Sequence, residues 1–200
     1  MKNLPFTKYS LTGSPVVCPI CGSSKRTIIS KLDRRFKILP HCKCDECALV
    51  RHELMLSDKQ LSEYYLKNYR TDYQWVNSGP TARHIEKRVS EAKTRLKNLQ
   101  PYLGKNSKIL DFGCGSGEFV ELAQNRGALA SGFEPGNLYA SYARDKKGLD
   151  VQNCGWENYE YKEKLDVTTA FHVFEHLTDP LKAFKKAISW LDVNGLIYIE

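Results

Sequence analysis

The sequence predicts an α/β fold, in which helices cover both faces of a parallel sheet, preceded by a small cysteine-rich ribbon. The sheet is predicted because strand-like and helix-like segments alternate from residue 109 to residue 200. The ribbon is predicted because two C-x-x-C pairs, Cys18/Cys21 and Cys44/Cys47, precede that alternation with 22 residues between them. We expect a tail and ribbon over residues 1–56, a helical linker over 57–80 and the sheet domain over 81–200.

The four paired cysteines have the spacing of a structural zinc site that leaves no open position for catalysis. Each pair lies in a tight turn that directs two sulfurs at one ion, and Gly22 permits the first of these turns. Cys42 competes with Cys44, but Cys44 and Cys47 repeat the spacing of the first pair, so Cys42 and His41 are expected to lie outside the site. A ribbon this small buries too little apolar area to fold without its metal. Its short strands are expected at 27–30, 36–39 and 48–50.

The segment that follows the ribbon is predicted to be helical. Residues 57–75 begin with a suitable helix cap, and their tyrosines allow two interpretations. Tyr64, Tyr65 and Tyr69 form either a lid over the ligand cleft or aromatic packing between ribbon and core. Residues 81–100 are predicted to form an amphipathic helix, which Pro101 ends. The apolar face of that helix is expected to contain Ile85, Val89, Ala92, Leu96 and Leu99.

The remaining residues supply the elements of the parallel sheet in alternation. Strands are expected at 109–112, 129–134, 149–152, 166–171 and 195–200. Helices are expected at 118–126, 137–145 and 180–191, and the crossover before the fourth strand must be short or distorted. This order is that of a Rossmann-like sheet with strand order 3-2-1-4-5. The chain stops inside its last predicted strand, so either it is a fragment or its sheet ends early with an exposed edge, and we expect a fragment that lacks C-terminal strands.

A glycine-rich turn follows the first predicted strand, in the sequence KILDFGCGSGEFV. Gly113, Gly115 and Gly117 separate a buried strand from a helix, an arrangement that binds nucleotide-like ligands beyond the strand's carboxyl end. A dinucleotide fingerprint would have a third glycine where this chain has Glu118. Asp111 would also repel a pyrophosphate, so the turn favours a ligand that carries a positive charge and argues against a nicotinamide oxidoreductase.

Glu134 ends the second predicted strand, twenty-three residues after Asp111. An acid at the end of the strand next to the glycine turn can accept both ribose hydroxyls of an adenosine. The loop after the third strand contains Trp156, which either stacks on the base or fills the core. These positions predict a nucleoside-containing ligand.

The D-x-G-x-G-x-G pattern from Asp111 resembles motif I of the class I S-adenosylmethionine-dependent methyltransferases. The segments LDVTTAFHVFEHLTDP and LDVNGLIYIE resemble the superfamily that includes the ubiquinone-pathway O-methyltransferases. The paired C-x-x-C sequences ahead of such a domain resemble its zinc-ribbon-bearing members, several of which act on sugars, nucleotide-sugars or surface polysaccharides. The resemblance covers about residues 16–50 and 105–200.

This resemblance implies roles for individual residues. The glycine turn would hold the methionine part of S-adenosylmethionine, with Asp111 towards its ammonium group. Relatives bind a divalent metal through E-x-x-E-H, but His172 takes the place of the first acid here, which puts metal binding at that site in doubt. The candidates for a general base are His172, Glu175 and His176. In the alternative interpretation, Glu175 and His176 have no catalytic role and only stabilise the loop after the strand. The expected cofactor site contains Asp111, Gly113, Cys114, Gly115, Gly117, Glu134, Pro135, Trp156 and His172.

The net charge of +7 is uneven, since residues 1–60 carry eleven basic and five acidic side chains. This excess favours an anionic or sugar-containing small-molecule acceptor. Two alternatives to a small-molecule methyltransferase remain. One is an RNA methyltransferase whose ribbon binds RNA, and the other is a non-catalytic module that binds S-adenosylmethionine. Seven cysteines, an odd number, indicate reduced thiols. No apolar run is long enough to span a membrane and residues 1–8 lack the apolar centre of a signal peptide, so we expect a cytoplasmic protein. Nothing indicates the oligomeric state.

Overall fold

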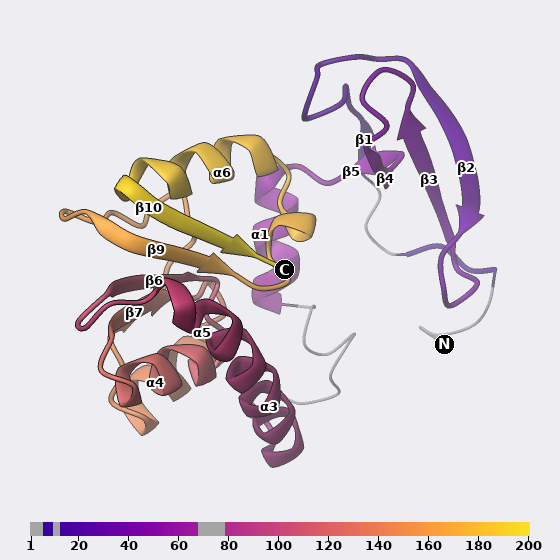
Figure 1. Ribbon diagram of the computed structural model, residues 1–200. Coiled ribbons are helices and arrows are strands. Elements are labelled where there is room, and N and C mark those ends of the chain that lie inside the picture. The colour runs from indigo at the N-terminus through magenta and orange to yellow at the C-terminus, as the bar shows by residue number, and fades with distance from the viewer. Residues whose placement is uncertain (1–5, 10–12, 68–78) are drawn as a thin grey trace. The chain divides into compact units, whose positions relative to one another are not determined.

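A computed structural model describes residues 6–9, 13–67 and 79–200 of the chain. The chain divides into two compact units (Figure 1). One contains residues 1–63 with 178–181, and the other contains residues 64–177 with 182–200. None of the helices in the described ranges has both the length and the apolar character that crossing a membrane requires.

The first unit is built on a three-stranded antiparallel sheet of order β2-β3-β4. Its strands are β2 (Arg26–Leu32), β3 (Ile38–Cys44) and β4 (Val50–His52). A separate two-stranded ladder joins β1 (Ser14–Pro15) to β5 (Leu54–Met55). The predicted strand at 27–30 lies within β2, but the predictions at 36–39 and 48–50 are wrong at their first residues. Phe36 and Ala48 have φ values of 59° and 62°, so each lies in a turn before its strand begins.

Helix α1 (Asp58–Lys67) confirms the helix predicted after Ser57 as far as it is described. Residues 68–78 lie outside the described part of the chain, and so does the proposed lid or packing residue Tyr69. The side chain of Tyr65 also lies outside it. Neither interpretation of the tyrosines is therefore tested.

Helix α3 (Ala82–Leu99) belongs to the second unit and matches the predicted helix closely. The hydroxyl of Thr81 accepts the His84 N–H at 3.2 Å and caps its first turn. A short 3-10 turn, η1 (Gln100–Tyr102), ends it. The buried residues of α3 are Ala92, Arg95, Leu96 and Leu99, so a charged residue lies on the face that was predicted to be apolar.

A five-stranded parallel sheet forms the centre of the second unit, in the order β10-β9-β6-β7-β8. This confirms the predicted order 3-2-1-4-5 and the Rossmann-like fold. The strands are β6 (Lys108–Phe112), β7 (Leu129–Phe133), β8 (Val151–Gln152), β9 (Leu165–Ala170) and β10 (Leu191–Ile199). The helices are α4 (Glu118–Asn125), α5 (Asn137–Ser141) and α6 (Pro180–Ser189).

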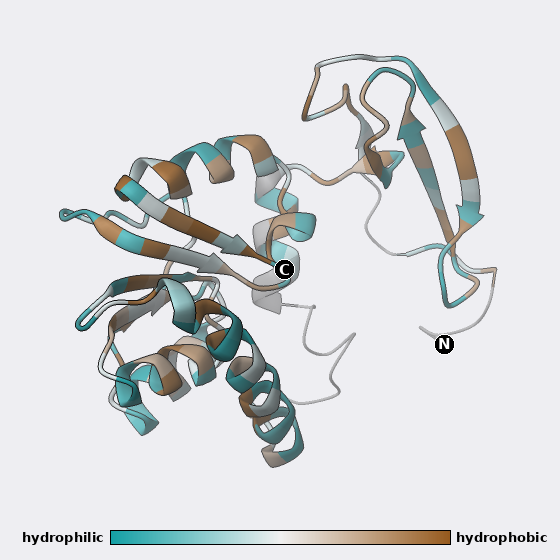
Figure 2. Cartoon of the chain, in the orientation of Figure 1, coloured by the Kyte–Doolittle hydropathy of each residue, from teal (hydrophilic) through white to brown (hydrophobic). Residues whose placement is uncertain are grey.

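The strands carry mainly apolar residues (Figure 2), as expected for a sheet that is buried on both faces. On one face Ile109 and Val167 pack with Leu96 and Val120, which come from α3 and α4. On the other face, the alternating strand positions Leu110 and Phe112 belong to a second cluster, with Phe133, Ala187 and Trp190. The sheet therefore separates two apolar cores.

Several boundaries differ from the sequence prediction. Helix α5 ends at Ser141 and continues as a π-helical turn, η2 (Tyr142–Lys146). Strand β8 has only two residues, where four were predicted. Strand β10 begins four residues early because Leu191 already pairs with Leu165, and its register then shifts before Leu196.

Candidate functional site

The glycine turn connects the carboxyl end of β6 to α4, and its conformation explains its sequence. Gly113, Gly115 and Gly117 have φ values of 74°, 57° and 80°, a region that other residues rarely adopt. A β-carbon at Gly113 or Gly117 would also lie 2.7 Å from Val173 or 2.5 Å from Leu149. Gly115 differs, because the nearest atom to a β-carbon there would be 4.0 Å away. Its backbone is therefore open to close approach by a ligand.

Glu134 lies directly after β7 and links this turn to the next loop. Its Oε2 accepts the Gly115 N–H at 3.1 Å, and its Oε1 accepts the Gly136 N–H at 2.8 Å. The side-chain amide of Asn153 donates to the carbonyl oxygens of Glu134 and Pro135 at 2.9 and 3.2 Å. The Glu134 carboxylate thus joins the loops that follow β6 and β7, while the backbone of Glu134 is held by the loop that follows β8.

Asp111 lies at the end of β6 and is almost fully buried, at 3% exposure. Its Oδ1 accepts the Thr169 hydroxyl at 2.7 Å. Burial raises the pKa of this carboxyl to about 7, although the Thr169 bond and the charge of Arg95 oppose the shift. Cys114 is also buried, and burial together with the Asp111 charge raises the pKa of its thiol. Asp111, whose carboxylate was expected near a ligand's ammonium group, is therefore buried near the end of β6, just before the glycine turn.

Glu118, which argued against a dinucleotide, begins α4 and is buried. Its Oε2 accepts the Ser116 hydroxyl at 2.8 Å, and its Oε1 lies 3.1 Å from the ammonium of Lys147. Lys147 also pairs with Glu121 at 2.9 Å. Glu118 is thus paired with Lys147 at the N-terminus of α4, where the helix dipole also stabilises a carboxylate.

The segment after β9 brings together the three residues proposed as a general base. His172 Nδ1 lies 3.5 Å from Glu175 Oε1, and His176 Nε2 lies 3.7 Å from the same oxygen. His172 Nε2 lies 3.5 Å from Glu200 Oε1 at the end of β10. The backbone of His172 has a φ of 58° and donates its N–H to the Glu200 carbonyl at 2.8 Å. All three side chains are exposed, in the segment that follows the carboxyl end of β9.

Trp156, proposed to stack on a base, is buried at 9% exposure. It belongs to the apolar cluster with Phe133, Tyr159 and Trp190. Pro135, in contrast, is exposed in the loop after β7. The structure therefore places these two expected cofactor residues in different environments.

Sequence reasoning missed Arg95 and Glu200. Arg95 could have been noticed, because it is a charged residue among the apolar positions of the 81–100 helix. Glu200 gave no comparable signal, since it gains its position from a partner that is distant in the sequence.

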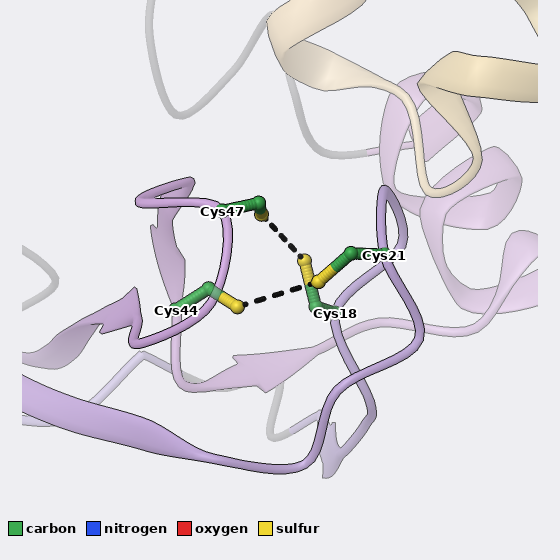
Figure 3. A group of neighbouring side chains, drawn as sticks. All are labelled: Cys18, Cys21, Cys44 and Cys47. Carbon is green, nitrogen blue, oxygen red and sulfur yellow. Dashed lines mark hydrogen bonds between the residues drawn. The ribbon is translucent and has the colours of Figure 1, made fainter.

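The first unit brings together the four cysteines that the sequence paired (Figure 3). Their sulfur atoms all lie within 4.8 Å of one another, and the Cys18–Cys47 and Cys21–Cys44 pairs are 3.5 Å apart. Tetrahedral zinc with Zn–S bonds of about 2.3 Å would separate its sulfurs by about 3.8 Å. Cys42 does not belong to the group and is fully buried in β3. The cluster fits a small zinc ribbon.

The two C-x-x-C turns have the same geometry. Gly22 and Ala48 each follow the second cysteine of a pair with φ values of 73° and 62°. Their N–H groups donate to the carbonyl oxygens of Cys18 and Cys44 at 2.8 and 3.0 Å. Burial acts to raise the pKa of Cys18, but bonds from backbone N–H groups outweigh it and lower this pKa to about 6. Backbone N–H groups also lower the pKa of Cys44. For Cys21 and Cys47, backbone N–H groups act to lower the pKa, but burial and the neighbouring thiols outweigh them and raise it. One thiol of each pair is thus stabilised as a thiolate, the form that binds a metal.

Comparisons with known proteins agree with this geometry. The family described as "Methyltransferase domain" matches residues 82–200. A ubiquinone biosynthesis O-methyltransferase of Histophilus somni is 30% identical over 121 residues, which cover 54% of this chain and 50% of that protein. A tRNA U34 carboxymethyltransferase of Campylobacter hominis is 30% identical over 110 residues, which cover 51% of this chain and 39% of that protein. The chain thus spans about half the length, or less, of these curated relatives.

A solved structure shows the same fold. It is the magnesium protoporphyrin IX methyltransferase of Synechocystis PCC 6803 with bound S-adenosylmethionine. The TM-score is 0.52 at 17% identity, and the alignment covers 69% of this chain and 74% of that one. The arrangement of sheet and helices is therefore shared at low sequence identity.

Proposed function

Since the chain belongs to the methyltransferase-domain family, we propose that it transfers a methyl group from S-adenosylmethionine to a polar acceptor. The observation that carries this proposal is the position of Glu134. Its carboxylate lies between the N–H groups of Gly115 and Gly136, beside the open side of the glycine turn. A carboxylate at this place is suited to the two hydroxyls of a ribose, and a glycine backbone suits a closely approaching ligand.

The residues proposed to hold the cofactor fit its chemistry. The turn from Gly113 to Gly117 would lie along the methionine part, and Glu134 would bind the ribose. Asp111, buried at the end of β6, would face the ammonium group of the methionine part, while Pro135 and Trp156 would border the base. Phosphate-free cofactors are favoured because Glu118 and Asp111 both lie at this turn.

When bound, S-adenosylmethionine supplies a methyl group on a positively charged sulfur, which makes a good leaving group. The protein's own contribution is chiefly alignment, which can supply about 7–11 kcal/mol. His172, Glu175 and His176 lie together at the end of β9 and are proposed to take the proton of the acceptor hydroxyl. A general base of this kind adds about 10²–10⁴-fold to the rate.

The acceptor is proposed to be a sugar, a nucleotide-sugar or another anionic intermediate. The support is the excess of basic residues in the first sixty residues of the chain. A structural zinc ion bound by the four clustered cysteines would hold the ribbon together. Zinc would have no catalytic role, because four thiolates fill its coordination sphere.

The assignment of Glu134 can be tested by titrating the full chain with S-adenosylhomocysteine in a calorimeter. Two hydrogen bonds to a charged group contribute about 1.5–3 kcal/mol each, so Glu134→Ala should weaken binding by about 100-fold or more. The matched control is Glu86→Ala, which removes an exposed glutamate from α3 and should leave affinity unchanged. Unchanged affinity in Glu134→Ala would refute the proposed site.

RNA is a second candidate acceptor, favoured by the same basic excess and by the likeness to the tRNA U34 carboxymethyltransferase. Binding to phosphates releases counterions, so affinity for a short RNA should fall by orders of magnitude between about 50 and 200 mM salt. Anisotropy measurements with the full chain would show this slope. Weak, salt-independent binding would favour the small-molecule acceptor.

A further inference from the structure

Arg95 is the buried charge that the apolar face of α3 did not predict. Only 5% of the residue is exposed, and its guanidinium lies 4.3 Å from the centre of the Phe171 ring. Its Nε and Nη2 donate to Glu200 Oε2 and Oε1 at 3.0 and 2.7 Å. Such a two-pronged bond fixes the plane of a carboxylate as well as its position. Residues 105 positions apart are thereby locked together at one edge of the sheet.

The carboxylate that Arg95 holds faces the proposed general base. Glu200 Oε1, which accepts from Arg95, lies 3.5 Å from His172 Nε2. The Arg95 bond holds the pKa of the Glu200 carboxyl below its usual range, so this group is ionised when it faces the imidazole. Glu175 faces the other ring nitrogen at 3.5 Å. The imidazole of His172 therefore lies between two acids, Glu175 and Glu200. Among the residues that the structure describes, only Glu200 of these two acids is shown with an arginine partner.

The same pair also borders open space. Arg95 and Glu200 line a hollow of about 220 Å³, together with Ser90, Glu91 and Thr94 of α3. Glu91 accepts Arg88 at 2.8 Å and lies 3.8 Å from Arg95, so α3 presents a connected set of charges here. The ion pair therefore joins α3 to the residue that follows β10, beside His172.

We propose that Arg95 is a positioning residue that acts through Glu200 to orient the imidazole of His172 on the acceptor side of the site. This rests on the proposed methyl transfer, because it gives His172 a task. Arg95 fixes Glu200, and Glu200 determines which nitrogen of His172 carries a proton and which way the ring faces. Neither Arg95 nor Glu200 is assigned a contact with the cofactor.

The test is a nitrogen NMR spectrum of the histidine side chains in the full chain, with the His172 signals assigned by their loss in His172→Asn. Arg95→Met and Glu200→Gln should both shift the Nε2 resonance of His172, and in the same direction. Arg95→Lys keeps the charge but not the fork, so it should restore the native resonance only in part. The matched control is Arg88→Met, which removes a guanidinium from the same helix that pairs with Glu91 and is half-exposed.

Thermal unfolding and calorimetry with S-adenosylhomocysteine accompany the spectra. The Arg95, Glu200 and Arg88 variants should bind this ligand as the native chain does, and Glu200→Gln supplies a folded variant if Arg95→Met unfolds. An unshifted His172 resonance in folded, ligand-binding variants would overturn the role of Arg95 but leave methyl transfer standing. Absence of ligand binding in the native chain would instead overturn the proposed function.

Discussion

The ribbon and the sheet differ in what fills their interiors. Among the described residues, the buried apolar side chains before residue 64 are three cysteines, Cys18, Cys42 and Cys44. The second unit instead buries two clusters of aliphatic and aromatic side chains, one on each face of its sheet. Several large apolar side chains of the ribbon, among them Ile29 and Phe36, are more than half exposed. One unit thus has an apolar core and the other does not.

This difference indicates which interactions stabilise each unit. Burying a large apolar side chain contributes about 1.5–3 kcal/mol, so the sheet can be stable through its packing. The ribbon's polar interior includes Arg51, which donates to the carbonyl oxygens of Val16 and His52 at 2.8 and 2.9 Å. Such bonds from a charged group contribute about 1.5–3 kcal/mol net each. Zinc bound by four thiolates contributes roughly 10–16 kcal/mol in small domains and would exceed them.

Removal of zinc is expected to have the largest effect and to separate the two units. A strong chelator, or Cys18→Ser, should abolish hydrogen-exchange protection in β2, β3 and β4 while β6 and β9 keep theirs. The reason is that the thiolates and their metal replace a core in the ribbon. Cys42→Ala is the matched control, because Cys42 is buried in the same sheet but lies outside the cluster. It should retain one zinc ion per chain. Protection that survives chelation would show that the ribbon is stable without metal.

The response to pH should be the second largest difference, and its sign should be opposite in the two units. Burial raises the pKa of Asp111 from 3.8 to about 7. Between these values the folded chain holds a proton that the unfolded chain has lost, so raising the pH favours unfolding. The sheet should lose up to about 4 kcal/mol of stability as the pH rises from 4 to 8. The ribbon should gain stability, because its thiols must lose protons to bind zinc.

Asp111→Asn isolates this effect. Urea unfolding, followed by the fluorescence of the buried Trp156 and Trp190, should show a smaller loss of stability between low and high pH in this variant. Asp145→Asn removes an exposed acid that pairs with Arg144, and its pH dependence should match that of the native chain. If Asp111→Asn kept the native pH dependence, another group would have to cause it.

The sequence predicted the sheet more accurately than the ribbon, for a physical reason. Buried parallel strands are continuous apolar runs, and the glycines after β6 mark where the first one ends. Ribbon strands are exposed, so their boundaries depend on single turn residues such as Phe36 and Ala48, whose φ values a sequence does not reveal. The shift in β10 was equally hidden, because it depends on the pairing of Leu191 with Leu165.

The residues of the candidate site also differ in how well the sequence could predict their positions. Glu134 could be predicted because the distance along the chain from one strand end to the next is nearly fixed in this fold. The pairing of Arg95 with Glu200 could not, since it joins elements that become neighbours only when α3 packs against the finished sheet. The burial of Asp111 beside Thr169 also depends on a neighbouring strand. Sequence reasoning therefore located a residue at a strand end, such as Glu134, better than a contact between distant elements, such as Arg95 with Glu200.

The smallest expected change in stability comes from exchanging equivalent residues between the two cysteine turns. Gly22 and Ala48 occupy equivalent places with φ values of 73° and 62°, but only glycine adopts this conformation without strain. A left-handed residue other than glycine costs about 1–2 kcal/mol. Gly22→Ala should therefore weaken the ribbon by about 1 kcal/mol, and Ala48→Gly should strengthen it by a similar or smaller amount. No other atom lies within 4 Å of a β-carbon built on Gly22, so steric overlap does not complicate the first substitution.

Competition for zinc with a chromophoric chelator measures both changes on one scale, because stability of the ribbon and affinity for its metal are coupled. The exchange variant Gly22→Ala/Ala48→Gly should return close to the native affinity, since each turn then carries the strain of the other. Such a result would mean that the two turns are energetically interchangeable around one ion. A large loss in the exchange variant would mean instead that the first turn needs its glycine for a reason beyond φ, and the equivalence of the two turns would fail.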